Sequence, residues 1–323
     1  MLDQKPLNEF STGDEFVSFL IVSKCEIKTS KTGKLFLNLE LRDRSLSLPS
    51  KVWDNAEEYA KKLKEGTVVK VAGSIEDFNG SPQIRIEKIR PAAAADNVST
   101  EDFLPRSTRP LDEMTDELNN ILKSVSNPFL SRLINSILSG ENLERYFKTP
   151  AGKGWHHAYL HGLLEHTLEI VRICELMCSI HPQIKRDLLI CGALLHDFGK
   201  TEELTYDSVF DYSDKGKLVG HIIIGALAVE KAAAAIPDFP EELKIQLIHL
   251  VLSHQGKLEY ASPVEPKTLE AIVLYQADEL SAKTNAYKSA IDMDRIKGGR
   301  WTRFLPLAET ALYIPDSTEN TDK

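Results

Sequence analysis

The spacing of apolar residues changes once along the chain, from a period of two to a helical period. Between residues 15 and 90 apolar and polar residues alternate, as in β-strands with one buried face. From residue 111 onward the apolar residues recur every three to four positions, as in helices that pack one face on a core. Residues 92–110, between these parts, begin with four alanines and are rich in Ser, Thr, Asp and Pro. We therefore expect two domains, one of strands and one of helices, joined by a linker.

Five strands and one short helix are expected in the first domain, residues 1–91. The strands cover residues 16–22, 35–41, 46–53, 67–78 and 83–89, and the helix covers residues 54–64. Turns are expected at Lys31 to Lys34 and at Asn79-Gly80, a pair typical of β-hairpins. This order of elements resembles the OB-fold, a small Greek-key barrel that often binds single-stranded nucleic acid or oligosaccharide.

Aromatic and basic residues of the first domain suggest a surface for a nucleic-acid strand. Phe36, Trp53 and Phe78 would form a stacking platform, and Lys34 would contact phosphates together with nearby basic residues, Arg42, Arg44, Lys51 and Arg85. The alternative is that the aromatic side chains fill the barrel interior and the basic residues form an ordinary solvated rim. These residues alone do not decide between the two interpretations.

Seven helices are expected in the second domain, residues 111–314. They cover residues 111–125, 128–138, 162–178, 186–196, 219–236, 241–254 and 267–283. Residues 222–235, which include an alanine run, suit a helix contact either inside this bundle or between subunits, so a homo-oligomer is left open. The last residues, 315–323, are polar and are expected to be disordered.

Charge and cysteine content narrow the class of protein. The net charge of −9 argues against a protein that coats nucleic acid by bulk electrostatics. Residues 1–95 carry 15 Lys and Arg against 14 Asp and Glu, so by subtraction the rest of the chain holds the net negative charge, roughly −10. The four cysteines lack Cys-x-x-Cys spacing, the chain does not begin like a signal peptide, and no apolar run approaches about 18 residues. We therefore expect a soluble cytoplasmic protein without a membrane partner.

One apolar run ends with the sequence Leu-Leu-His-Asp-Phe-Gly-Lys, which occupies residues 194–200. An adjacent imidazole and carboxylate at the end of a buried helix need compensation, and a divalent metal ion is the commonest one. Each of these side chains alone is more often a core residue with a satisfied hydrogen bond. Together, imidazoles and carboxylates without cysteine suit an open hydrolytic site for Mn, Fe, Mg, Ni or Zn. The polar residues that interrupt apolar stretches in this way are His166, His196, Asp197, His221, His254 and Asp278.

The order of His166, then His196-Asp197, then Asp278 resembles the signature of the HD metal-dependent phosphohydrolase superfamily. The OB-like first domain and the segments 155–159 and 252–263 narrow the resemblance to the YhaM family of 3′→5′ exoribonucleases, over most of the chain. The resemblance implies an all-helical HD bundle in the second domain. It also implies metal-dependent removal of nucleotides from the 3′ end of single-stranded RNA, with single-stranded DNA left open as a further substrate.

By the same resemblance, two groups of residues would hold metal ions, and Mn²⁺ is the expected ion. His166, His196, Asp197 and Asp278 would hold the first ion, and His221 and His254 would hold the second with Asp197 bridging. The family commonly has His-His where this chain has His254-Gln255. A glutamine carbonyl is a poorer ligand than an imidazole, so binding of the second ion is left open.

The expected chemistry is hydrolysis of a phosphodiester by a metal-activated water. Lys200, one turn beyond His196, is expected to contact a phosphate oxygen, unless it is a surface lysine. We place His156 in substrate binding and His157 in catalysis, with an exposed, solvated histidine pair as the alternative. Two other functions remain open: a nucleotide phosphohydrolase with a regulatory OB domain, and a non-catalytic nucleic-acid-binding protein.

Overall fold

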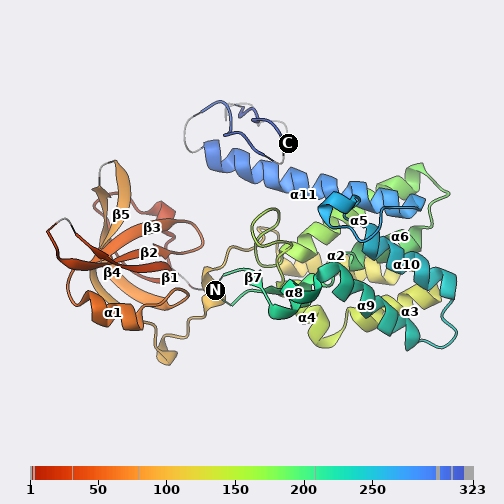
Figure 1. Cartoon of the computed structure of the whole chain (residues 1–323), viewed down its shortest axis with the longest axis horizontal. Coiled ribbons are helices and arrows are strands. Elements are labelled where there is room, and N and C mark those ends of the chain that lie inside the picture. The colour runs from red at the N-terminus through yellow and green to blue at the C-terminus, as the bar shows by residue number, and fades with distance from the viewer. Residues whose placement is uncertain are drawn as a thin grey trace. The chain divides into compact units, whose positions relative to one another are not determined.

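The structure is a computed structural model that describes residue 2 and residues 4–30, 32–78, 80–207, 209–295, 299–306 and 308–315. It divides into two compact units (Figure 1). The β unit comprises Met1–Pro105 and Tyr206–Phe210, and the helical unit comprises Arg106–Thr205 and Asp211–Lys323. The expected turn residues Lys31 and Asn79 and the expected disordered tail after residue 315 lie outside the described residues.

The β unit is a closed barrel of five strands. Around the barrel the order is β1-β2-β3-β5-β4, and of the neighbouring pairs only β3 and β5 run parallel. This arrangement confirms the expected OB-fold. The elements are β1 (Glu15–Thr29), β2 (Leu35–Arg42), β3 (Ser47–Val52), α1 (Ala56–Lys62), β4 (Val68–Phe78) and β5 (Ser81–Pro91).

Strand β1 is longer than the apolar pattern predicts. Its first half pairs with β4 and its second half pairs with β2, and a bulge lies between Val22 and Lys24. A bulge bends a strand, so one strand can belong to both sides of the barrel. The alternation of apolar residues predicts only the segment up to Val22, because the side chains beyond it are partly or fully exposed.

Aliphatic side chains fill the barrel interior, among them the fully buried Leu37, Leu39 and Val71. Trp53 and Phe78 are instead 44% and 52% exposed. The interpretation in which these two aromatic side chains fill the barrel is therefore wrong.

The helical unit contains all seven expected helices, which confirms its fold class. Among the described residues of this unit, the two-stranded hairpin of β6 with β7 is an exception to the helical architecture. The elements are α2 (Leu111–Ser124), α3 (Pro128–Ile137), α4 (Gly140–Lys148), α5 (Gly162–Ile180), α6 (Arg186–Leu195), α7 (Lys200–Glu203), β6 (Leu204–Thr205), β7 (Asp211–Tyr212), α8 (Asp214–Val219), α9 (His221–Ala234), α10 (Glu241–Ser253), η4 (Leu258–Tyr260) and α11 (Leu269–Arg295).

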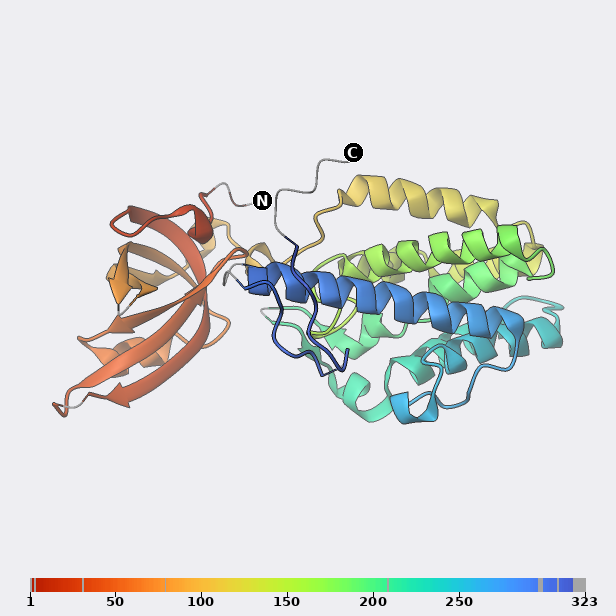
Figure 2. The same cartoon turned by 90° about the horizontal axis from the view of Figure 1, so that it is seen from above.

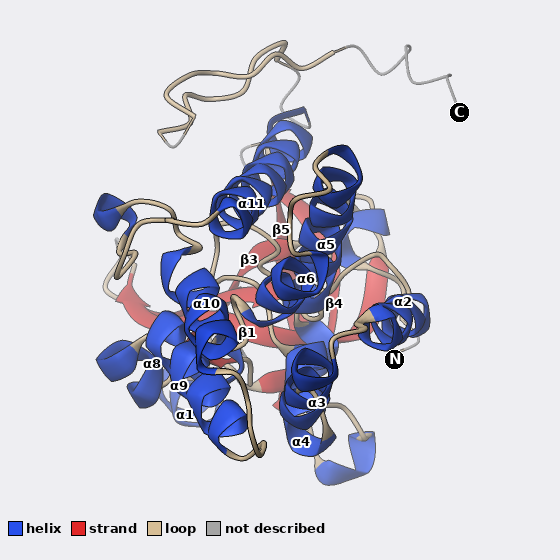
Figure 3. Cartoon of the chain, turned by 90° about the vertical axis from the view of Figure 1, so that its right-hand side faces the viewer, coloured by secondary structure: helices blue, strands red, loops and turns tan. Residues whose placement is uncertain are grey.

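Helix α6 lies at the centre of the helical unit. Seen along the bundle, it lies among α3, α5, α10 and α11, and it packs on all four (Figure 3). Every residue from Leu188 to Leu195 is buried. The long helix α11 runs beside α5 along the unit (Figure 2). The residues that follow α6 directly are therefore held in the interior, where polar side chains need partners.

Several helix boundaries differ from the expected ones, most of them by one or two residues. The helix expected from residue 219 begins at His221, because Gly220 has a φ of +78° and interrupts it. Helix α11 continues to Arg295 rather than ending at Lys283. Among the described residues, none of the helices combines the length and the hydropathy that crossing a membrane requires.

Candidate metal centre

The six side chains expected to bind metal come from five helices and meet at the end of α6. His166 lies in α5, and His196 and Asp197 follow α6 directly. His221 is the first residue of α9, His254 follows α10, and Asp278 lies in α11. Residues separated by more than a hundred positions are therefore brought into one cluster by the packing of these helices around α6.

Asp197 lies between two groups of histidines. Its Oδ2 atom is 3.3 Å from His196 Nε2 and 3.9 Å from His166 Nε2. Its Oδ1 atom is 3.4 Å from His221 Nε2 and 3.5 Å from His254 Nε2. Within each group the possible ligand atoms all lie within 4.8 Å of one another. The carboxylate is thus placed so that one oxygen faces each group.

Asp278 completes the first group. Its Oδ1 atom lies 3.0 Å from His166 Nε2. Three atoms of the cluster, His196 Nε2, His221 Nε2 and Asp197 Oδ1, are buried without a hydrogen-bond partner. An unpartnered buried polar atom is costly, and a bound cation removes that cost. The donor set and its unpartnered atoms therefore fit one or two divalent cations.

The Nδ1 atoms of the four histidines all face hydrogen-bond acceptors. A neutral imidazole that donates through Nδ1 has an unprotonated Nε2, which is the form that binds a metal ion. Each Nε2 in turn faces Asp197 or Asp278. The acceptors are Ser281 Oγ for His166 at 2.9 Å, Ala193 O for His196 at 2.7 Å, Val251 O for His254 at 2.7 Å, and the Glu203 carboxylate for His221 at 3.0 Å.

Ser281 fixes the tautomer of His166 through a second hydrogen bond. The Ser281 hydroxyl donates to Glu169 Oε2 at 2.6 Å. A hydroxyl has a single proton, so towards His166 it acts as the acceptor and Nδ1 donates. The Glu169–Ser281–His166 chain of hydrogen bonds therefore leaves His166 Nε2 without a proton, which is the form that binds a cation.

Burial and charge favour the protonation states that metal binding needs. Burial lowers the pKa of His166 to about 4, and it also lowers the pKa of His254. Burial raises the pKa of Asp197, but the Lys200 and His196 charges outweigh it and hold this pKa well below its usual range. His196 differs, because the Asp197 carboxylate outweighs burial and raises its pKa. A cation at this centre would oppose that protonation.

Lys200 is held inside the unit and is not a surface lysine. It is 7% exposed, and its Nζ atom donates to Asp197 Oδ2 at 2.5 Å and to Ala151 O at 2.6 Å. The glycine before it, Gly199, packs against α9: a Cβ atom there would lie 2.0 Å from the carbonyl oxygen of His221. Glycine at this position therefore allows α7 and α9 to approach closely enough for His221 to face Asp197.

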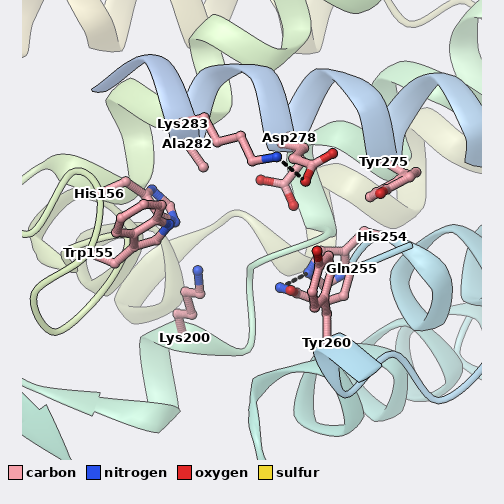
Figure 4. A pocket seen from close by; sticks show the side chains of 11 residues that line it. Trp155, His156, Lys200, His254, Gln255, Tyr260, Tyr275, Asp278, Ala282 and Lys283 are labelled. Carbon is pink, nitrogen blue, oxygen red and sulfur yellow. Dashed lines mark hydrogen bonds and ion pairs between the residues drawn. The ribbon is translucent and has the colours of Figure 1, made fainter. Parts of the chain in front are cut away.

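A cavity of about 380 Å³ opens at the metal centre. Trp155 and His156 lie on one side, Gln255 and Tyr260 on the other, and Asp278 and Lys283 on α11 (Figure 4). The cavity is lined by Trp155, His156, Lys200, His254, Gln255, Tyr260, Tyr275, Asp278, Glu279, Ala282 and Lys283.

His156 and His157 occupy different surroundings. His156 lines the cavity, and burial holds its pKa well below the usual range. His157 is 1% exposed and is not among the residues that line this cavity. Its Nε2 atom lies 3.3 Å from Glu169 Oε2. Its backbone N–H donates to Asn285 Oδ1 at 2.8 Å. The two are therefore not an exposed, solvated histidine pair.

Each of the two units matches a known protein family. The HD domain family matches residues 163–283, and the family of OB-fold nucleic acid binding domains matches residues 21–92. The 3′-5′ exoribonuclease YhaM of Bacillus subtilis (strain 168) is 32% identical over 304 residues, which cover 94% of this chain and 96% of that protein. The chain belongs to the YhaM family.

Other relatives agree with this assignment. The 3′-5′ exoribonuclease YhaM of Oceanobacillus iheyensis is 33% identical over 309 residues, or 95% of this chain and 96% of that protein. Among solved structures, a domain of replication protein A from Methanococcus maripaludis covers 27% of this chain and 92% of its own. Its TM-score is 0.24 at 18% identity.

In this YhaM family member the sequence did not reveal the residues that support the ligands. Glu169 and Ser281 each lie three positions after a candidate ligand, His166 and Asp278, and this spacing on one helix face was an available signal. Glu203 has no such signal, because it reaches His221 from another helix. The aromatic residues of the cavity come from a loop, from η4 and from α11 and share no sequence spacing.

The β unit groups the expected platform residues on the outside of its barrel. The ring centroids of Phe36 and Trp53 are 4.7 Å apart. The Lys51 ammonium lies 5.8 Å from the ring centroid of Phe36 and 4.9 Å from that of Phe78. Lys34 pairs with Asp54 at 2.9 Å. Exposed aromatic rings beside ammonium groups suit a single strand, and this role stays a prediction.

Proposed function

We propose that this chain is a metal-dependent 3′→5′ exoribonuclease that releases mononucleotides from single-stranded RNA. The observation that carries the proposal is the cluster of candidate ligands around Asp197, which together with Asp278 opens into a cavity lined by aromatic and charged side chains. The relatives are named 3′-5′ exoribonucleases, which supports both the 3′→5′ polarity and the RNA substrate. The OB-fold of the β unit supports binding of a strand.

The proposed ligands are those of the two groups around Asp197. His166, His196, Asp197 and Asp278 would hold the first ion, and Asp197, His221 and His254 the second. A bound divalent cation makes a water molecule more acidic and neutralises charge on the phosphate. A mixed set of imidazoles and carboxylates suits Mn²⁺, which we propose as the ion, with Fe, Ni, Mg and Zn as alternatives.

Two side chains, Lys200 and His156, would act on the phosphate directly, and His157 would act through one of them. The Lys200 ammonium is fixed beside Asp197 and lines the cavity, so it would orient a non-bridging oxygen as a point charge. His156 faces the same cavity and would contact the phosphate or the leaving oxygen. For His157 we propose an action through His156, because their Nδ1 atoms are 3.3 Å apart.

The affinity for a second ion would depend on the surroundings of His254. Gln255 lines the cavity, and its Nε2 atom is 3.3 Å from His254 Nε2. His221 and Asp197 supply the remaining donors of that group. We propose that the group binds its ion more weakly than the first group does, because it has one ligand fewer.

Three finer proposals concern substrate, assembly and location. Single-stranded DNA would be a second substrate, because stacking and phosphate contacts do not require a 2′-hydroxyl. The alanine-rich helix α9 leaves a homo-oligomer open. We also propose a cytoplasmic location, which the four free cysteines support.

A double variant tests the proposed function. His196→Ala combined with Asp197→Ala removes the two residues at the end of α6, and we expect it to abolish the release of mononucleotides from a single-stranded RNA in Mn²⁺. Binding of the RNA should remain largely intact, because the platform of the β unit is unchanged. His181→Ala, at an exposed histidine outside the cavity, is the matched control and should keep full activity. Undiminished hydrolysis by the double variant would refute the proposal.

A further inference from the structure

The cavity at the metal centre carries more aromatic surface than phosphodiester hydrolysis requires. Trp155 and Tyr260 line it and are 41% and 48% exposed. Tyr275 adds a third ring from α11. Phosphate chemistry uses charges and metal ligands, whereas exposed aromatic faces are suited to stack on a nucleobase.

The loop that carries Trp155 is held in a fixed conformation. Its residue His157 has a φ of +43°, which is unusual for a residue with a side chain. Asn285 on α11 accepts the His157 N–H at 2.8 Å and donates to the Tyr159 hydroxyl at 3.2 Å. The Trp155 ring meets Tyr287 edge to face, with centroids 6.2 Å apart. The indole is therefore anchored while part of its surface remains free.

The opposite side of the cavity is also preorganised. Gly256 has a φ of +77°, and a Cβ atom there would lie 2.1 Å from Tyr275 Cε2, so the ring of Tyr275 packs directly on the glycine backbone. Tyr260 has the Lys257 ammonium 5.1 Å from its ring centroid. In Figure 4, Trp155 and Tyr260 lie on opposite sides of the cavity, with Lys200 and Asp278 between them.

We propose that this cavity binds the 3′-terminal nucleoside of the RNA, with its base against Trp155 and Tyr260. The inference rests on the proposed function, because the nucleotide that leaves must lie beyond the bond that is cut. A volume of about 380 Å³ is at the small end for ligand pockets, so it suits one nucleotide rather than a strand.

The charges around the cavity fit a site that tolerates every base. Lys283 and Glu279 pair with each other at 2.6 Å, and Lys200 is held by Asp197. These charged side chains are therefore already paired within the protein. Stacking depends on the face of a base and is tolerant of sequence, as an enzyme that removes successive nucleotides requires.

The experiment compares two RNAs labelled at the 5′ end that differ only in whether the 3′-terminal nucleotide carries its base. The rate of removal of that nucleotide is measured in Mn²⁺ for the wild-type chain and for Trp155→Ala and Tyr260→Ala. We expect the wild type to remove the abasic nucleotide roughly 5- to 150-fold more slowly, the range that stacking of one base gives. Each alanine variant should slow removal of the normal nucleotide and reduce the difference between the two RNAs.

Three further variants serve as controls. Trp155→Phe and Tyr260→Phe keep an aromatic ring and should keep most of the difference. Trp301→Ala removes an indole that is 61% exposed and is not among the residues lining the cavity, and it should behave as the wild type. Metal content and thermal unfolding of each variant report whether the centre remains intact.

Two results would overturn the subsite. The first is removal of the abasic and the normal nucleotide at equal rates by the wild type. The second is an equal slowing of both RNAs by the alanine variants, which would mean that the rings support the loop rather than the base. Failure of the wild type to shorten the normal RNA at all would instead overturn the proposed function, and this inference with it.

Discussion

Asp197 is shared between two groups of histidines, and the Nδ1 atom of each histidine faces a hydrogen-bond acceptor. One carboxylate oxygen faces His166 and His196 and the other faces His221 and His254. The acceptors at the Nδ1 atoms determine which nitrogen of each ring can bind a cation. Loss of one of these acceptors should therefore weaken the centre although all of its ligands are still present.

Ser281→Ala tests the role of these acceptors. The change removes the acceptor for His166 Nδ1 and the link to Glu169. We expect a loss of about 10- to 100-fold in Mn²⁺ affinity or in activity, which is typical when such a partner is removed. Calorimetric titration with Mn²⁺ measures the affinity. Thr284→Ala, at an exposed position of the same helix, should leave it unchanged. Equal affinity in Ser281→Ala and the wild type would contradict this account of His166.

The side chains that meet at the candidate centre could be predicted from the sequence, and the residues that surround them could not. His196 and Asp197 stand out because they end an apolar run, and the family signature assigns partners to them. Glu203 carries no such mark, since a glutamate in a short helix is common on protein surfaces. Trp155 lies in a segment that carries the family resemblance, but the sequence alone does not place its ring at the cavity. Their roles depend on helix packing and loop conformation, which apolar spacing does not encode.

At the scale of elements, α7 and α9 must approach closely for the second group of ligands to form. Gly199 lies where a Cβ atom would meet the His221 carbonyl oxygen at 2.0 Å and the Gly225 nitrogen at 2.9 Å. Neither backbone atom can move without displacing α9. The close packing against α9 therefore explains why this position of the His-Asp-Phe-Gly-Lys segment is a glycine.

Gly199→Ala should move His221 away from Asp197. We expect the variant to bind fewer Mn²⁺ ions per chain, with the second group affected first, and to lose about 1–3 kcal/mol of folding stability through overpacking. Metal analysis after dialysis measures the stoichiometry, and denaturant unfolding measures the stability. Ile223→Ala, at a residue of α9 that is 38% exposed, is the control. An unchanged stoichiometry together with unchanged stability would show that the backbone absorbs the methyl group.

The elements predicted from the sequence are those with a strong apolar period. The barrel strands and the long helices have this period, because one face of each is buried. Helix α4 is not among the predicted helices, although Leu143, Tyr146 and Phe147 have a helical spacing and pack on the core. The last turns of α11 were missed because few of the side chains after Lys283 are buried. The β6–β7 hairpin is two residues on each strand and is too short to show any period.

At the scale of the whole molecule, one chain combines a surface suited to a strand with a centre suited to cutting it. The platform of the β unit presents Trp53 and Phe78 with Lys51 over the Phe78 ring. The helical unit presents the ligands around Asp197. We therefore expect binding of long RNA and hydrolysis of a phosphodiester to be separable by substitution.

Trp53→Ala and Phe78→Ala test this separation. Each should weaken binding of single-stranded RNA by about 1–3 kcal/mol, because each removes a stacking surface. Binding by the wild type should also fall as salt rises, through release of counterions. Hydrolysis of a small phosphodiester without a strand should be unchanged in both variants. Val17→Ala, at an exposed apolar residue of β1, is the control for binding. Parallel losses of binding and of small-substrate hydrolysis would contradict the separation.

The most direct test of the central claim is the product pattern from an RNA labelled at its 5′ end, with and without Mn²⁺. We expect a ladder of labelled fragments that shortens from the 3′ end when Mn²⁺ is present, and no shortening after the metal is removed by a chelator. The ladder would establish the reaction and its direction together. Immediate release of a labelled mononucleotide, or an intact RNA in the presence of Mn²⁺, would contradict a metal-dependent 3′→5′ exoribonuclease.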